Sequence, residues 1–213
     1  MKFENVSVYN FENAIRGARN ALESWEKIDS FSSNGVFKFG DNDLNLCQRL
    51  INAGSPSHRK FLRQIFVSVD ITAPMYWWSE FDTYKVGTVA NSTSKMHKLA
   101  STEITPDKFE FDSVVEVLSD HDDLPVIIAT CNLLENYRQE YLRTKDKRVW
   151  RALIQLLPES WLQKRTVTLN YENLYCMIRD RKGHKLIEWH KFIDFVGTLP
   201  YSNELLFLNY DKE

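Results

Sequence analysis

Hydrophobic positions at the start of the chain change from a strand-like to a helical period. Residues 6–9 favour a short strand, and Asn10 or Asn13 is placed to cap a helix. Beyond that cap, apolar residues recur every three or four positions, at Ala14, Ile15, Ala18, Ala21, Leu22 and Trp25. The pattern therefore predicts a strand followed by a helix.

A second helix and a longer strand are predicted next. The helix begins at Asp41 or Asp43, and Gly54 ends it. Its apolar face carries Leu44, Cys47, Leu50 and Ile51. Residues 61–71 instead alternate, and the apolar side of the alternation carries Ile65, Val67, Val69 and Ile71. Alternation of this kind predicts a half-buried strand.

Helical spacing dominates the rest of the chain. Pro74 suits the first turn of an aromatic-rich helix. Residues 114–143 have the longest helical pattern, and they predict two helices because Pro125 cannot donate a helical hydrogen bond and disfavours helical backbone at Leu124. Further elements are expected as a helix at 146–157, a strand at 165–169, and helices at 172–181 and 184–196. Since 213 residues can bury one sizeable core, we expect a single α+β domain over residues 1–213.

Composition and charge exclude several classes of protein. The chain is 43% hydrophobic and 26% charged, as ordinary folded proteins are, which argues against disorder. A net charge of -2 provides no overall basic field, so we expect no nucleic-acid partner. The N-terminal sequence lacks a signal-peptide core and no apolar run is long enough to span a membrane, so we expect a cytoplasmic protein without a membrane partner.

Cysteine and histidine spacing gives little support for a metal site. Cys47, Cys131 and Cys176 lack CxxC spacing, which indicates reduced, mostly buried side chains. The histidines show no HExxH spacing. An acidic run at residues 119–123 surrounds His121 and could bind a cation, but its place before Pro125 favours a helix-capping turn. We therefore expect no metal.

The segment at residues 77–98 gathers polar donors after an aromatic helix. It carries hydroxyl and amide groups together with Lys85, Lys95, His97 and Lys98. Such donors can meet phosphate or the edge of a flavin ring, although from the residues alone a solvated loop is the favoured interpretation. Motifs of the GxGxxG, GxxxxGK[ST] and GxSxG types do not occur, which disfavours the common nucleotide folds and the α/β-hydrolases.

The order of several short segments resembles the flavin-dependent thymidylate synthase family. Residues 54–71 resemble the family's strand entry, with His58 at its His position. Residues 74–97 resemble its signature helix and loop, where Asn91 and Ser94 are identities. In that alignment Glu80 stands at the family's Gln, and its RHR triplet is replaced by Thr83, Tyr84 and Lys85. The C-terminal part matches without a gap at Leu156 to Pro158, Thr168 to Asn170, Arg181 and Glu188.

This resemblance implies a fold, ligands and an assembly. The family fold is a mostly antiparallel sheet packed against long helices, assembled as a homotetramer. The family binds flavin adenine dinucleotide (FAD) and deoxyuridylate, a pyrimidine nucleotide, and it uses methylenetetrahydrofolate and NADPH as co-substrates. Carried over by position, the FAD contacts are His58, Thr83, Tyr84, Lys85, Asn91 and Asn170. The substrate contacts are Glu80, Ser94, Lys95, Arg151 and Arg181. Because the flavin carries the chemistry, no side-chain nucleophile is expected.

Departures from the family pattern leave the activity open. Ile154 stands at the family's phosphate-binding Arg, and Arg151 is the nearby replacement, one helical turn away. Each lost charge-assisted hydrogen bond costs roughly 1.5 to 3 kcal/mol. Three hypotheses follow: a thymidylate synthase-like enzyme, an enzyme of the same fold with another nucleotide substrate, or a silent relative acting as a nucleotide-binding or assembly module.

Overall fold

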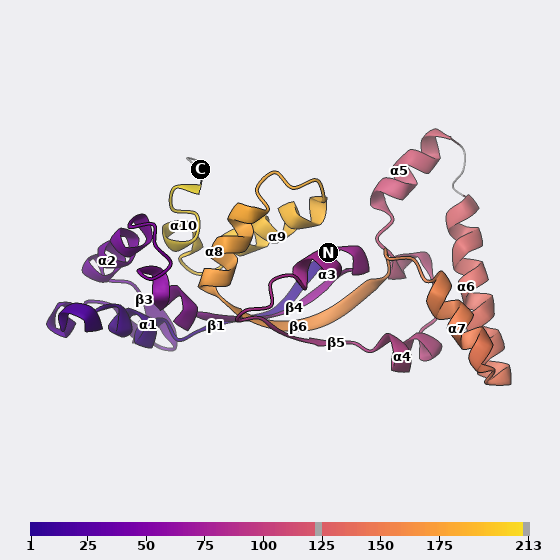
Figure 1. The fold of residues 1–213 in the computed structure, drawn as a ribbon, viewed down its shortest axis with the longest axis horizontal. Helices are drawn as coiled ribbons and strands as arrows, with labels where there is room; N and C mark the ends of the chain where they lie inside the picture. The colour runs from indigo at the N-terminus through magenta and orange to yellow at the C-terminus, as the bar shows by residue number, and fades with distance from the viewer. Residues whose placement is uncertain (122–124, 211–213) are drawn as a thin grey trace. The chain divides into compact units, whose positions relative to one another are not determined.

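The computed structural model describes residues 1–121 and 125–210, which form an α+β fold (Figure 1). A four-stranded antiparallel sheet has the strand order β1-β4-β6-β5. Its strands are β1 (Lys2–Tyr9), β4 (Phe66–Pro74), β6 (Leu162–Asn170) and β5 (Val89–Ser92). A separate antiparallel hairpin consists of β2 (Phe31–Ser33) and β3 (Val36–Lys38). The expected fold class, α+β with an antiparallel sheet, is confirmed.

The α-helices follow the apolar periods of the sequence closely. In chain order they are α1 (Phe11–Ala18), α2 (Asp41–Asn52), α3 (Met75–Phe81), α4 (Lys95–Lys98), α5 (Asp112–Asp120), α6 (Pro125–Thr144), α7 (Lys147–Leu156), α8 (Tyr171–Asp180), α9 (Ile187–Gly197) and α10 (Ser202–Leu205). The expected pair of helices around Pro125 is present as α5 and α6, and Leu124 lies outside the described residues. Asp146 caps α7 by accepting a hydrogen bond from the backbone of Arg148.

Two predicted elements were too long. Residues 61–64 are not part of the strand but belong to a 3₁₀ helix, Arg59–Gln64. Phe61 and Leu62 are both buried, and two adjacent buried residues do not fit a strand that buries every second side chain. The predicted alternation from Ile65 to Ile71 is confirmed, because its four apolar residues are all at most 1% exposed.

The first helix also ends earlier than its apolar spacing predicts. It stops at Ala18, and Leu22, placed on the predicted apolar face, is 83% exposed. The next residue, Arg19, is buried and donates a 2.6 Å hydrogen bond to the carboxylate of Asp43. The backbone then turns through a left-handed conformation at Glu23. A buried ion pair therefore replaces further helix at this point.

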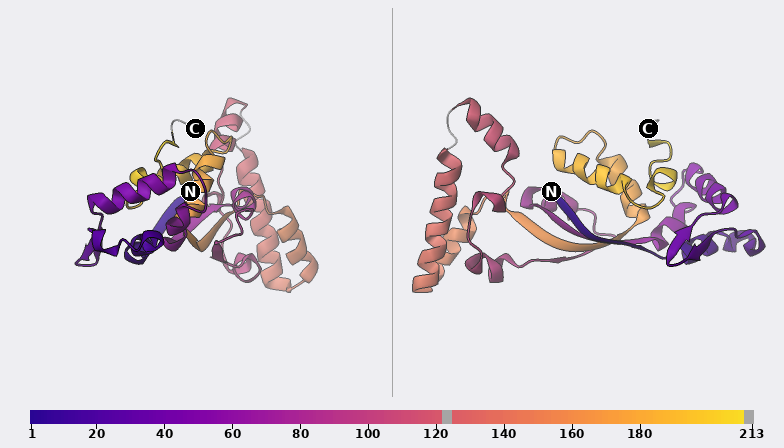
Figure 2. Two further views of the ribbon diagram at one scale, coloured as in Figure 1. Left: turned by 60° about the vertical axis from the view of Figure 1, so that its left-hand side comes forward. Right: turned by 180° about the vertical axis from the view of Figure 1, so that it is seen from behind.

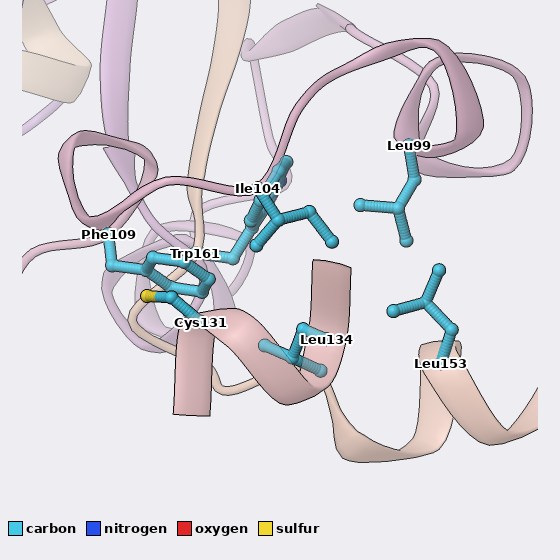
Figure 3. Close-up of a cluster of buried hydrophobic side chains, with 7 residues drawn as sticks. All are labelled: Leu99, Ile104, Phe109, Cys131, Leu134, Leu153 and Trp161. Atoms are coloured by element: carbon cyan, nitrogen blue, oxygen red, sulfur yellow. The ribbon is translucent and has the colours of Figure 1, made fainter. Parts of the chain in front are cut away.

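Clustering of the chain gives two compact units. Unit 1 contains residues 1–2, 71–83 and 91–165, and unit 2 contains residues 3–70, 84–90 and 166–213. In unit 1, α6 and α7 lie side by side (Figures 1 and 2). Their inner faces contribute Cys131, Leu134 and Leu153 to a buried cluster that also holds Leu99, Ile104, Phe109 and Trp161 (Figure 3). The expectation of one domain over residues 1–213 stays a prediction.

Unit 2 is held by α8 and by the aromatic side chains around it. Six residues of α8 are buried: Tyr171, Glu172, Leu174, Tyr175, Met177 and Ile178. Glu172 forms an ion pair with Arg59, with nitrogen-to-oxygen distances of 3.0 and 3.1 Å. The guanidinium of Arg59 also lies 4.3 Å from the ring centroid of Tyr175. These contacts fix α8 within its own unit.

Candidate ligand site

The end of α8 places Arg181 between aromatic rings. Its Nε donates a 3.0 Å hydrogen bond to the hydroxyl of Tyr84. Its guanidinium carbon lies 4.6 Å from the ring centroid of the fully buried Trp189 and 5.4 Å from that of Tyr84. The Trp189 ring, the Tyr84 hydroxyl and a 3.2 Å contact between Nη1 and His184 Nε2 hold the guanidinium in place. A planar fork can recognise a carbonyl or phosphate group with two donors.

Arg181 also serves the helix itself. It is the C-cap residue of α8, and its backbone nitrogen donates a 3.0 Å hydrogen bond to the carbonyl of Met177. Burial raises the pKa of Tyr84, while the hydrogen bond from Arg181 opposes that rise. The Tyr84 hydroxyl therefore stays protonated at neutral pH and donates a 3.3 Å hydrogen bond to Asp180. A helix-capping role and a ligand-binding role are thus compatible at Arg181.

The other end of α8 anchors the loop that follows Tyr84. Asn170 and Asn173 form a reciprocal capping box, which satisfies two backbone nitrogens at the helix start. Asn173 Nδ2 donates a 2.7 Å hydrogen bond to the carbonyl of Val86. Gly87 has a φ of 76°, and a Cβ there would lie 2.9 Å from the Asn170 amide nitrogen. Glycine is therefore required where the loop crosses the helix end.

These contacts bring three of the predicted FAD residues to one region of unit 2. Tyr84 and Lys85 lie on the loop, and Asn170 lies at the helix start that holds it. His58 lies elsewhere in the unit, in a hollow of about 410 Å³. Gln64 and residues of α1 also line this hollow, but no other predicted FAD contact does. The structure therefore does not bring His58 to the loop.

Four of the predicted ligand contacts in unit 1 lie in residues 74–97, the segment that resembles the signature helix and loop of the family. Thr83 is exposed, and its hydroxyl donates a 2.7 Å hydrogen bond to the carbonyl of Glu80 at the end of α3. Asn91 is exposed on β5. Ser94 accepts a 3.3 Å hydrogen bond from the backbone of His97 and so caps the short helix α4. The sequence did not predict β5 or α4, because both are short and carry mostly polar residues.

A small hollow of about 260 Å³ in unit 1 connects the signature segment to the end of α7. Its lining includes Ser79, Asp82, Lys95, Ile154 and Pro158. Ile154, which the sequence resemblance aligns with the phosphate-binding Arg of the thymidylate synthase family, lines this hollow. Arg151, the expected replacement, is exposed on α7 and does not line the hollow. Lys95 is therefore the cation of this lining.

Arg165 is a candidate that the sequence reasoning missed. Its Nη1 donates a 2.7 Å hydrogen bond to Asp82, and its guanidinium carbon lies 4.2 Å from the ring centroid of Trp78. Asp82 itself lines the small hollow. A charged residue at the start of the predicted strand 165–169 was the available signal, but its partner Asp82 is 83 positions away in sequence.

In residues 1–121 and 125–210, the cysteines form no disulfide and the metal-ligating side chains do not cluster. All three cysteines are free; Cys47 and Cys131 are buried and Cys176 is half-buried. Within residues 1–121 and 125–210, no group of three or more metal-ligating side chains is present. Asp122 and Asp123 of the acidic run lie outside the described residues, so the predicted capping turn there stays a prediction. In the same described ranges, no helix combines the length and apolarity needed to cross a bilayer.

Comparison with known proteins gives structural similarity without sequence similarity. No protein-family model matches the chain, and a search of curated proteins found no match. The chain is similar to the flavin-dependent thymidylate synthase ThyX from Helicobacter pylori complexed with FAD and dUMP, with a TM-score of 0.68 and 17% identity over 97% of this chain and 98% of that one. A second Helicobacter pylori ThyX structure with FAD and dUMP gives a TM-score of 0.68 and 18% identity over 99% and 98%. At this identity the similarity establishes the fold alone.

Proposed function

We propose that the chain is a thymidylate synthase-like enzyme that binds FAD and transfers a one-carbon group to deoxyuridylate or a related pyrimidine nucleotide. The observation that carries the proposal is the near-complete structural similarity to two thymidylate synthases complexed with FAD and dUMP. The similarity covers the whole of the described fold rather than one common motif. An independent observation supports it. The loop that begins at Tyr84 is hydrogen-bonded to Asn173 at the start of α8 and to Arg181 at its end, and the family resemblance places ligand contacts at both ends.

The flavin contacts are proposed on the chemistry of the donor set. Lys85 offers an ammonium group, and Tyr84, Thr83 and Asn170 offer hydroxyl and amide groups, while flavin adenine dinucleotide presents phosphate and carbonyl oxygens. Lys85 is exposed, so its charge is available to a phosphate. Asn91 and His58 stay candidates from the resemblance alone, since His58 lines a different hollow. With one cation in place of the family's two arginines, we expect weaker FAD binding than in relatives with the full triplet.

The nucleotide contacts are proposed residue by residue. Arg181 contacts the base through its guanidinium edge, since its face is occupied by Trp189. Ser94 and Lys95 contact the phosphate, because Lys95 lines the hollow that contains Ile154. Glu80 and Arg151 stay candidates from the resemblance. Lys95 supplies a single point charge in place of the planar fork of an Arg. We therefore expect a lower affinity for the nucleotide phosphate, but not its loss.

Catalysis in this proposal depends on placement. When bound, the flavin carries the reducing equivalents, with methylenetetrahydrofolate as the one-carbon donor and NADPH as the reductant. The side chains orient the base and neutralise the phosphate, which is consistent with a structure whose candidate residues are donors rather than nucleophiles. No proton-transfer residue is assigned.

We also propose that the protein is a homotetramer. Helix α5 buries none of its residues, and Val114, Val115 and Val117 are 40%, 44% and 56% exposed. On α6, Val126, Ile128 and Leu133 are about as exposed. A largely exposed apolar helix face is poorly stable in water, and a second copy of the chain would cover it.

The direct test is a titration of the purified protein with FAD, monitored by flavin fluorescence and absorbance. Binding should quench or shift the flavin signal, and it should be weakened in the Lys85→Gln variant but not in Lys147→Gln, an exposed lysine of unit 1. If saturating FAD changes neither signal in the wild-type protein, the enzyme proposal fails and the silent nucleotide-binding or assembly module replaces it.

A further inference from the structure

A large pocket within unit 1 has walls rich in lysine, and we refer to it as the lysine pocket. Its volume is about 650 Å³, within the range of pockets that hold small-molecule ligands. All its lining residues belong to unit 1, and they come from residues 1–2, β4, β6 and the segments around α4 and residues 106–110. It shares Ser94 and Lys95 with the proposed phosphate contacts, but none of the proposed base or flavin contacts lines it.

The charge of the lysine pocket is strongly positive in a chain that is negative overall. Five lysines line it against two carboxylates: Lys2, Lys95, Lys98, Lys108 and Lys164 against Asp107 and Glu110. Asp107 already pairs with Lys108, and Glu110 pairs with the amino group of Met1. Among ion pairs of the described residues, none includes Lys95 or Lys98. Like charges around one hollow repel one another, and a bound anion relieves that repulsion.

The walls of the lysine pocket are fixed in place. The backbone of Thr93 donates a 2.9 Å hydrogen bond to the carbonyl of Lys164, and Gln163 Nε2 donates one of 2.7 Å to the carbonyl of Thr93. These bonds join the segment before α4 to β6. Leu99, directly after α4, inserts into the buried cluster of unit 1 (Figure 3). The lysine stems therefore start from ordered backbone on two sides of the hollow.

The pocket also has an apolar surface. Leu99, Trp161 and Leu162 line it, and the Trp161 ring packs edge-on against Phe109 with centroids 5.3 Å apart. Thr72, Thr93 and Thr102 also line the pocket, and the hydroxyls of Thr93 and Thr102 donate to the backbone carbonyls of Lys164 and Lys98, so their oxygens are left as acceptors. A simple inorganic ion would use the lysines but leave the apolar part and most of the volume unfilled. The combination fits an anion that carries a flat or apolar group.

From these observations we propose that the lysine pocket binds a second ligand, a phosphorylated small molecule with a ring, distinct from the pyrimidine nucleotide of the proposed function. Lys98 and Lys164 hold the phosphate, and the half-buried Leu162 beside Trp161 receives the ring. Lys95 lines both the lysine pocket and the small hollow, so it is shared rather than specific to either. This proposal does not depend on flavin binding, because no proposed FAD contact lines the pocket.

The test uses ADP, inorganic pyrophosphate and adenosine as probes, with isothermal titration calorimetry on the full chain. ADP should bind more tightly than pyrophosphate or adenosine, because only ADP fills both parts of the pocket, and its affinity should fall as salt rises. Changing Lys98→Gln and Lys164→Gln together should weaken ADP binding at least tenfold. Lys147→Gln is the matched control on an exposed helix position of the same unit. Both lysine sites are at the surface of the pocket, so circular dichroism should show an unchanged fold.

Three results would overturn the proposal. They are absence of ADP binding to the wild-type protein, equal ADP affinity in the double variant and in Lys147→Gln, and full competition between ADP and saturating deoxyuridylate. If deoxyuridylate does not bind at all while ADP binds as expected, the proposed function fails and the lysine pocket stands. The two proposals are therefore separated by the same set of titrations.

Discussion

Helices α5 and α8 are nearly equal in length and differ in almost every other respect. Helix α8 buries six of its residues and begins with a capping box. Helix α5 buries none, and its N-cap residue Phe111 makes no side-chain cap. Both have a clear apolar pattern in the sequence. The pattern therefore predicts a helix in each case but does not tell whether the apolar face is covered within the chain.

The fixed position of α8 supports the proposed ligand contacts at its two ends. A binding residue needs a fixed position, and α8 is held by its buried face, by Arg59 and by the loop at Val86. Arg181 and Asn170 stand at the two ends of this fixed helix. Helix α5 has no such support, and its exposed valines are suited to contact with another copy of the chain.

The largest effect should come from removing the carboxylate of Glu172 on α8. Glu172→Ala leaves the buried guanidinium of Arg59 unpaired, which should lower the free energy of unfolding by about 3 to 5 kcal/mol. Glu116→Ala on the exposed surface of α5 should change it by less than about 0.5 kcal/mol. Urea denaturation of both variants measures the contrast. Equal stabilities would mean that α8 is not fixed by this ion pair.

The pH dependence of the unfolding free energy tests how α6 is anchored in unit 1. Hydrogen bonds from Arg138 lower the pKa of Glu135 on α6 from its usual 4.5 to about 2. Because the pKa is depressed in the folded state, this stabilisation is present above pH 4.5 and is lost as the pH falls toward 2. Glu135→Gln should flatten this part of the stability curve, whereas Glu140→Gln, exposed on the same helix, should not. An unchanged curve in Glu135→Gln would show that α6 is not anchored at this point.

The smallest effect on folding is expected at Val117 of α5. Since its side chain is 56% exposed, Val117→Asp should alter the unfolding free energy of the isolated chain by less than about 0.5 kcal/mol. Its effect on assembly should be large, because a charge in an apolar interface costs several kcal/mol. Light scattering should show the proposed tetramer for wild type and smaller species for the variant. A wild-type protein that is monomeric at micromolar concentration would remove the assembly proposal.

The sequence predicted the parts of the fold whose burial follows a regular period. Strand β4, helix α8 and the break at Pro125 all depend on local patterns, and all are present. The 3₁₀ helix at Arg59 and the early end of α1 were missed, because each depends on a buried Arg whose acidic partner lies far along the chain. The same limit applies to the ligand sites. Arg181 could be proposed from the C-terminal match, but the lysine pocket joins residues separated by more than sixty positions.

The most direct test of the proposed function is the affinity of Arg181→Lys for deoxyuridylate. Lysine keeps a cation at the end of α8 but cannot supply a planar pair of donors, so we expect at least a tenfold rise in Kd, about 1.4 kcal/mol, with little change in Tm. Arg16→Lys, exposed on α1 of the same unit, is the matched control and should bind as wild type does. If Arg181→Lys binds deoxyuridylate as tightly as wild type, or if the wild-type protein binds none, the assignment of the nucleotide site is contradicted.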